Sequence, residues 1–189
     1  AELAELGWEE AGEGALLLVE WAERVGDALP PDRLEVAFAL APDLGDEARR
    51  AALIGYGRYG ELVARERASA LLLADAGWAG ARRDFMLGDA STRAYERLTR
   101  PNGDSAILMI SPPRPDGPPV RYGKPYSAIA RLAEDVKPFV AIAEGLAAQG
   151  FSAPRIEAVD FETGLAVIED FGGDGDVSGD GAPIQERYM

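Results

Sequence analysis

The chain has 189 residues, with 19 basic against 33 acidic side chains and a formal net charge of −14 at pH 7. This charge disfavours clustered cations on a phosphate backbone, so direct nucleic-acid binding is not expected. The absence of cysteine and histidine excludes disulfides, thiolate and histidine metal sites, and catalytic pairs that need a histidine base. The apolar runs are too short for a membrane span or a signal segment, so we expect a cytoplasmic protein without a membrane partner.

The first part of the chain predicts an α/β pattern that lacks a beginning. Ala1 is not a start methionine, and we expect a processed or truncated product. In the strand at 33–40, Leu34, Val36 and Phe38 alternate and are expected to face inward. The predicted elements are a helix end at 1–10, a core strand buried on both faces at 15–21, strands at 33–40 and 48–55 that pair antiparallel, and a helix at 58–73.

The second part predicts short strands around one helix. The predicted strands are 85–91, 94–99, 105–110, 155–160 and 165–169, with a helix at 127–149 that is interrupted at Pro138. Residues 101–104 predict a hairpin turn, because Asn102-Gly103 tolerates positive φ at both central positions. Six prolines between 111 and 126 predict an irregular loop. Three strands, a helix and two strands make an α+β pattern.

A G-x-G-x-x-G motif at Gly55–Gly60 follows an apolar run and opens a helix. It is open to two interpretations. A dinucleotide-binding domain would use these glycines for phosphates and Asp75 for a ribose, and it requires a parallel strand at 71–75. A simple turn between an edge strand and a helix is the interpretation we favour, because Tyr59 is bulky beside the third glycine.

Two further motifs resemble metal sites. Asp170-Phe171-Gly172 spells the D-F-G of kinases, but the chain lacks the histidine of the catalytic loop and has Asn102 as its only asparagine. We interpret it as a connector whose backbone groups can meet an adenine edge. The acidic positions of 174–180 have calcium-loop spacing, but Gln185 stands where a bidentate glutamate is required. We interpret that segment as a solvated loop and expect no metal site.

The stretch 85–98 is the most informative in the chain. A glycine with small and hydroxyl residues lies between two predicted strands. Such a turn can place backbone N–H groups and hydroxyls over phosphates, and Arg93 adds positive charge.

Residues 79–189 resemble the N-terminal lobe of aminoglycoside-phosphotransferase-type kinases, and in particular the AmgK-like branch, which phosphorylates the anomeric hydroxyl of N-acetyl amino sugars. The resemblance rests on residues 88–98, 107–109, 135–142, 152–156 and 168–172. It implies a five-stranded lobe that clamps ATP, with Mg²⁺ as the accompanying ion. The nucleotide-binding residues that it implies are Gly88, Asp89, Ser91, Thr92 and Arg93 over the phosphates, and Glu169, Asp170 and Phe171 as the hinge beside adenine.

The chain departs from the kinase pattern at two matched places. Leu108-Met109 stands where the phosphate-binding lysine is expected, and Phe139-Val140 stands near its glutamate partner. Loss of both groups together avoids a buried unpaired charge.

Residues 1–68 resemble the C-terminal part of TsaE-type ATPases, which help to install threonylcarbamoyl on adenosine in tRNA. The match rests on residues 5–10, 18–21, 29–30 and 33–36. It implies that Glu20 acts at a Mg-nucleotide site, with the family's phosphate loop lying before Ala1. The partners that this resemblance implies are other tRNA-modification proteins.

The sequence therefore predicts an α/β part at 1–68, an incomplete P-loop ATPase, and an α+β part at 69–189, a kinase-like lobe with a five-stranded antiparallel sheet and a helix. The parent is expected to be bifunctional, and to pair a tRNA-modification ATPase with an amino-sugar kinase, while the chain itself is expected to be inactive. The alternatives are a non-enzymatic acidic protein-interaction module and the dinucleotide-binding domain at Gly55–Gly60.

Overall fold

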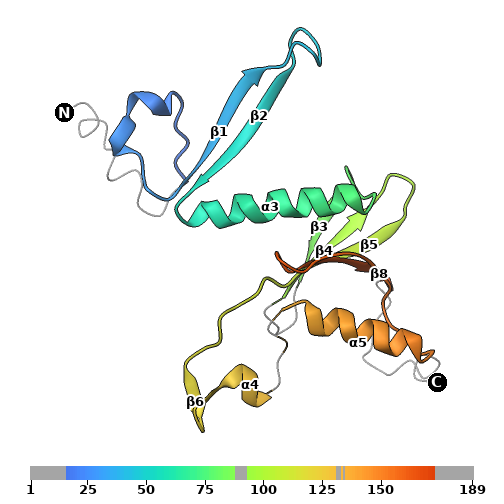
Figure 1. Ribbon diagram of the computed structural model, residues 1–189. Coiled ribbons are helices and arrows are strands. Elements are labelled where there is room, and N and C mark those ends of the chain that lie inside the picture. Colours follow the sequence, from blue (N-terminus) through green and yellow to red (C-terminus); the bar gives the residue numbers. More distant parts are fainter. Residues whose placement is uncertain (1–15, 88–92, 131–132, 134, 173–189) are drawn as a thin grey trace, which may run out of the picture. The chain divides into compact units, whose positions relative to one another are not determined.

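The computed structural model describes residues 16–87, 93–130, 133 and 135–172 (Figure 1). The chain divides into two compact units, residues 1–64 and 65–189. None of the helices in these described ranges combines the length and apolarity that a bilayer span requires.

In the first unit, an antiparallel hairpin leads into a helix. Strands β1 (Arg33–Leu40) and β2 (Arg49–Tyr56) pair over their whole length, with Val36 opposite Leu53. Helix α3 (Arg58–Asp75) begins two residues after β2. Asp32 holds its start, because its Oδ1 accepts the Arg58 N–H at 2.9 Å. These elements confirm the strands and the helix predicted for this part.

Two predictions about burial in the first unit are wrong. The run 15–21 is not a core strand: its described residues lie outside any strand, and Leu16 and Leu18 are 98% and 91% exposed. Leu34, Val36 and Phe38 are also exposed. A strand buried on both faces needs strands beside it and layers above and below, and the strands in the described part of this unit are β1 and β2 alone.

The three glycines of the G-x-G-x-x-G motif serve the turn from β2 to α3. Gly57 has φ +54°, and a side chain on Gly55 would collide with the backbone of Tyr59 in the first turn of the helix. The dinucleotide alternative is wrong in its key requirement, because residues 71–75 belong to α3 rather than to a parallel strand. The motif is the strand-to-helix turn that we favoured.

The second unit is built on a five-stranded antiparallel sheet. Its strands lie in the order β3-β4-β5-β9-β8. Their bounds are β3 (Arg82–Met86), β4 (Ala94–Thr99), β5 (Ser105–Ile110), β8 (Ile156–Asp160) and β9 (Leu165–Glu169). All neighbours pair antiparallel, which confirms the predicted sheet.

The first strand of this sheet begins earlier than predicted. The sequence pattern placed it at 85–91, but β3 starts at Arg82 and ends at Met86. The charged start is stable in an edge strand because Arg83 pairs with two carboxylates, Glu96 at 2.6 Å and Glu66 at 2.9 Å. Residues 88–92 lie outside the described ranges.

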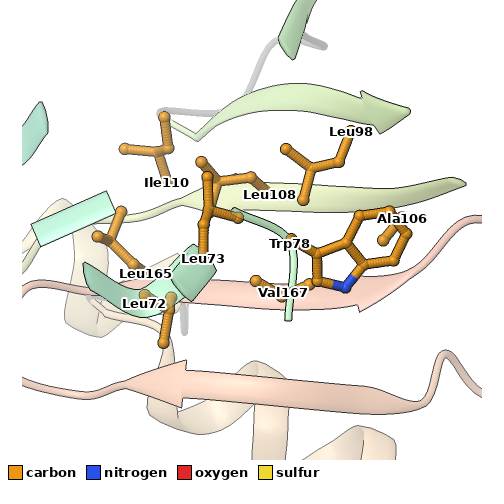
Figure 2. Packing of buried hydrophobic residues seen from close by; sticks show 9 residues of the cluster. All are labelled: Leu72, Leu73, Trp78, Leu98, Ala106, Leu108, Ile110, Leu165 and Val167. Atoms are coloured by element: carbon orange, nitrogen blue, oxygen red, sulfur yellow. The ribbon is translucent and has the colours of Figure 1, made fainter. Parts of the chain in front are cut away.

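Each face of the sheet carries an apolar cluster. On one face, the second half of α3 and Trp78 cover the central strands (Figure 2); the cluster is Leu72, Leu73, Trp78, Leu98, Ala106, Leu108, Ile110, Leu165 and Val167. On the other face, helix α5 (Lys137–Ala148) packs; that cluster is Ile107, Met109, Val136, Val140, Ala166 and Ile168. Because β5 and β9 are central, they are apolar on both faces rather than alternating.

The connections of the second unit follow the sequence closely. Pro138 lies in the first turn of α5, and Gly150 follows the helix with φ +83°. The proline-rich stretch 111–126 is largely irregular, as predicted, apart from the short strands β6 (Pro119–Arg121) and β7 (Lys124–Pro125). The helix predicted at 127–149 is two helices, α4 (Tyr126–Ala130) and α5, and the described residues 133, 135 and 136 between them are not helical.

Candidate functional site

The candidate site lies where the chain leaves the sheet at the end of β9. Glu169 is the last residue of the strand, and both its backbone and its side chain are tied to the residue before β8. Its N–H donates to the Arg155 carbonyl at 2.9 Å, and its carboxylate accepts the Arg155 N–H at 3.1 Å. The backbone N–H of Glu169 is therefore already used within the protein, and the segment that turns away from the sheet starts at Asp170.

Asp170 is held by contacts on several sides. Its side chain is only 4% exposed, and the Arg97 Nε lies 2.9 Å from its Oδ2. Its Oδ1 accepts hydrogen bonds from the Gly172 N–H at 2.9 Å and from the Arg97 Nη2 at 3.3 Å. Burial acts to raise the pKa of Asp170, but hydrogen bonds from Gly172, Ser105 and Arg97 outweigh it and hold the pKa below its usual value.

These contacts show how the acidic residue of the D-F-G motif is used within the protein. The carboxylate of Asp170 faces an arginine rather than other acids. Among the described residues, no cluster of three or more acidic side chains is placed to hold a metal ion. Phe171, the middle residue of the motif, is 65% exposed. The acidic run at 174–180 lies outside the described ranges.

The register of the sheet places the Arg97–Asp170 pair on the face that carries α5. Arg97 pairs with Ile107, which pairs in turn with Ile168. Ile107 and Ile168 both belong to the cluster under α5. Because side chains alternate along a strand, Tyr95 lies on that same face.

Arg93 is the one predicted phosphate-turn residue within the described ranges; Gly88, Asp89, Ser91 and Thr92 lie outside them. It immediately precedes β4, and its guanidinium carbon lies 5.6 Å from the centre of the Phe139 ring on α5. Arg93 and Arg97 are thus near opposite ends of one strand, about 14 Å apart at the usual rise per residue.

Apolar side chains occupy the positions expected for the kinase lysine and glutamate. Leu108 and Met109 are both fully buried. Met109 and Val140 belong to the same cluster between β5 and α5. The two departures from the kinase pattern therefore lie together, and no charge is left buried without a partner there.

The structure also shows features that sequence reasoning missed. Arg97 is the ion-pair partner of Asp170. The sequence feature that could have identified Arg97 is its charge at an inward-facing position of a predicted strand. A cavity of about 320 Å³ also opens beside α5. Its lining includes Arg93, Phe139, Ile142, Leu146, Ser152 and Pro154.

Glu20, the predicted catalytic residue of the first part, is exposed and lies outside any strand. The structure does not place it at the end of a core strand, as the apolar run at 15–21 predicted. The TsaE resemblance, with its nucleotide site and its tRNA-modification partners, stays a prediction from the sequence.

Comparison with known proteins supports a sugar-kinase-like region in this chain. No protein-family model matches the chain. Over 119 residues it is 48% identical to an N-acetylmuramate/N-acetylglucosamine kinase of Caulobacter vibrioides, an alignment that covers 58% of this chain and 32% of that kinase. The chain thus spans about a third of the length of this relative. It contains a region similar to a sugar kinase, and the five-stranded antiparallel sheet with its helix is compatible with a kinase-like lobe.

Proposed function

We propose that residues 69–189 form the ATP-binding lobe of a kinase that phosphorylates an amino sugar. The observation that carries this proposal is the 48% identity to a kinase of N-acetylmuramate and N-acetylglucosamine. The sheet order and the helix between its third and fourth strands in chain order support it. The cofactor is ATP, which supplies the phosphoryl group when it is bound.

In this proposal the nucleotide lies along the α5 face of the sheet. The base meets the segment Glu169–Phe171, where the chain turns away from β9 and exposes the Phe171 ring. The phosphates meet the turn before β4, which contributes Gly88, Asp89, Ser91 and Thr92 together with Arg93. The strand β4 connects the two ends, because Arg93 precedes it and Arg97 lies near its far end.

The described residues do not fit a magnesium site, because they contain no suitable acidic cluster. The ligands of the ion and the base that activates the sugar hydroxyl are assigned to a second lobe, as phosphoryl transfer requires. The role of this chain is to bind and orient the nucleotide. With Met109 in place of a lysine, positive charge at the phosphates comes from Arg93.

The direct test supplies the whole gene product with MgATP and either N-acetylmuramate or N-acetylglucosamine, and looks for sugar phosphate by mass spectrometry. We expect phosphorylation of at least one of these sugars, and the Caulobacter kinase serves as the positive control. Failure to phosphorylate any amino sugar under conditions where the control is active would overturn the proposal.

The tRNA-modification ATPase is not part of this proposal. It rests on residues 1–68, where the predicted core strand before Glu20 is not formed.

A further inference from the structure

The Arg97–Asp170 ion pair also holds the backbone of Gly172. Arg97 Nη2 reaches both Asp170 Oδ1 at 3.3 Å and the Gly172 carbonyl at 3.4 Å. Asp170 Oδ1 in turn accepts the Gly172 N–H at 2.9 Å. Both backbone groups of Gly172 are therefore tied to this pair.

The consequence is a fixed backbone on both sides of Phe171. Before it, Glu169 is paired to Arg155 within the sheet. After it, Gly172 adopts φ +90° and is held by the ion pair. The two clamped ends leave Phe171 between them with an exposed ring.

We infer that Arg97 and Asp170 are positioning residues that hold the backbone of residues 170–172 in the conformation that receives the purine base. This inference rests on the proposed function and deepens it. It adds that Arg97, a residue of β4, fixes the backbone that recognises the base. In the proposed binding mode the phosphates lie at the turn before β4, so the pair affects how well ATP binds and how well its base is selected.

The chemistry of the pair favours this role over metal binding. The Asp170 carboxylate has its oxygens directed to Arg97 and to the Gly172 N–H. A carboxylate engaged in this way is a poor ligand for a cation, because the arginine would have to be displaced. Arg97 is part-exposed, so removal of Asp170 leaves a cation that can still reach water.

The test compares Asp170→Asn and Arg97→Lys in the whole gene product. The Asn variant keeps the size of the side chain but loses its charge. The Lys variant keeps the charge but replaces the planar fork of donors by a single point, so it cannot maintain the same set of contacts. We measure KM for ATP, KM for GTP, kcat at saturating amino sugar, and the melting temperature.

Asp160→Asn is the matched control. Asp160 also caps a turn beside β9, at the other end of that strand, where it accepts the Glu162 N–H at 2.9 Å and the Thr163 hydroxyl at 2.6 Å. Its loss is expected to lower the melting temperature without changing nucleotide selection. A variant that acts only through stability would behave like this control.

We expect KM for ATP to rise about tenfold in Asp170→Asn, the size of a lost charge-assisted hydrogen bond. The rise in Arg97→Lys should be smaller, kcat should stay within about twofold, and the preference for ATP over GTP should fall in both variants. Loss of kcat with unchanged KM for ATP, or an ATP/GTP preference equal to that of the control, would overturn the inference. If Asp170→Asn does not fold, Arg97→Lys decides on the same readouts. An inactive wild type would instead overturn the proposed function.

Discussion

Met109 shows at the residue scale how the contact between β5 and α5 is made without a buried charge. It is fully buried on β5, in the same cluster as Val140 of α5. Apolar side chains at both positions avoid the desolvation of two ions and keep helix and sheet in contact. The pair is therefore expected to behave as one energetic unit.

A double-mutant cycle tests this coupling. Met109→Lys alone should lower the free energy of unfolding by about 3 to 5 kcal/mol, because it buries a charge with no partner. Adding Val140→Glu should recover part of that loss, so the two effects are not additive. Urea unfolding of the four proteins gives the coupling energy. Strictly additive losses would contradict the contact between these positions.

The lowered pKa of Asp170 makes a prediction about acid stability. The folded protein binds the proton less readily than the unfolded chain, so the stabilising contribution is complete above the ordinary aspartate pKa and is lost as the pH falls through the lowered one. Unfolding followed in urea between pH 6 and pH 3, values chosen to bracket about 4, should show a weaker pH dependence in Asp170→Asn than in the wild type. Parallel curves would show that the carboxylate contributes nothing.

At the element scale, the turn between β4 and β5 shows what a sequence can and cannot predict. The β4–β5 turn lies where Asn102-Gly103 predicted it, but only Gly103 has positive φ. Pro101 and Asn102 are the central residues of a turn closed by the Gly103 N–H on the Arg100 carbonyl at 3.0 Å. The proline presets the φ of the first central position, which the Asn-Gly rule alone does not consider.

Two glycines with positive φ should respond differently to alanine. Gly103 (φ +93°) has open space around it, so Gly103→Ala should cost only the backbone strain, about 1 to 2 kcal/mol. At Gly164 (φ +73°), a Cβ would collide with the Ser111 carbonyl and lie 2.7 Å from Pro112 Cα. Gly164→Ala should therefore cost about 2 to 5 kcal/mol, since overpacking adds to the strain. Equal losses in thermal unfolding would contradict this.

The β1–β2 hairpin shows the limit of pattern reasoning for an element. Alternation correctly predicts the strands and shows that Leu34, Val36 and Phe38 share one face. It does not show whether anything covers that face, because burial depends on segments that periodicity along one strand does not identify. The same limit applies to the apolar run at 15–21, whose described part is exposed.

At the scale of the whole molecule, the order of elements in the second part is readable from the sequence, but the pairing is not. Turn residues and apolar runs predict all five strands, and only the bounds of β3 are wrong. That strand starts at two charged residues, Arg82 and Arg83, which the apolar pattern does not include. The strand order β3-β4-β5-β9-β8 was not predicted, because the antiparallel pairing of β5 with β9 joins distant segments. For the candidate site, the sequence pointed to residues 88–93 and 169–171, and Arg97 was missed because its partner is 73 residues away.

The central claim is that this sheet holds the nucleotide on the face that carries α5. Photolabelling of the whole gene product with 8-azido-ATP, followed by peptide mapping, tests it most directly. We predict labelling within residues 82–172, at β4 or at the end of β9, that unlabelled ATP suppresses. ATP-suppressible labelling found wholly outside these residues would contradict the account.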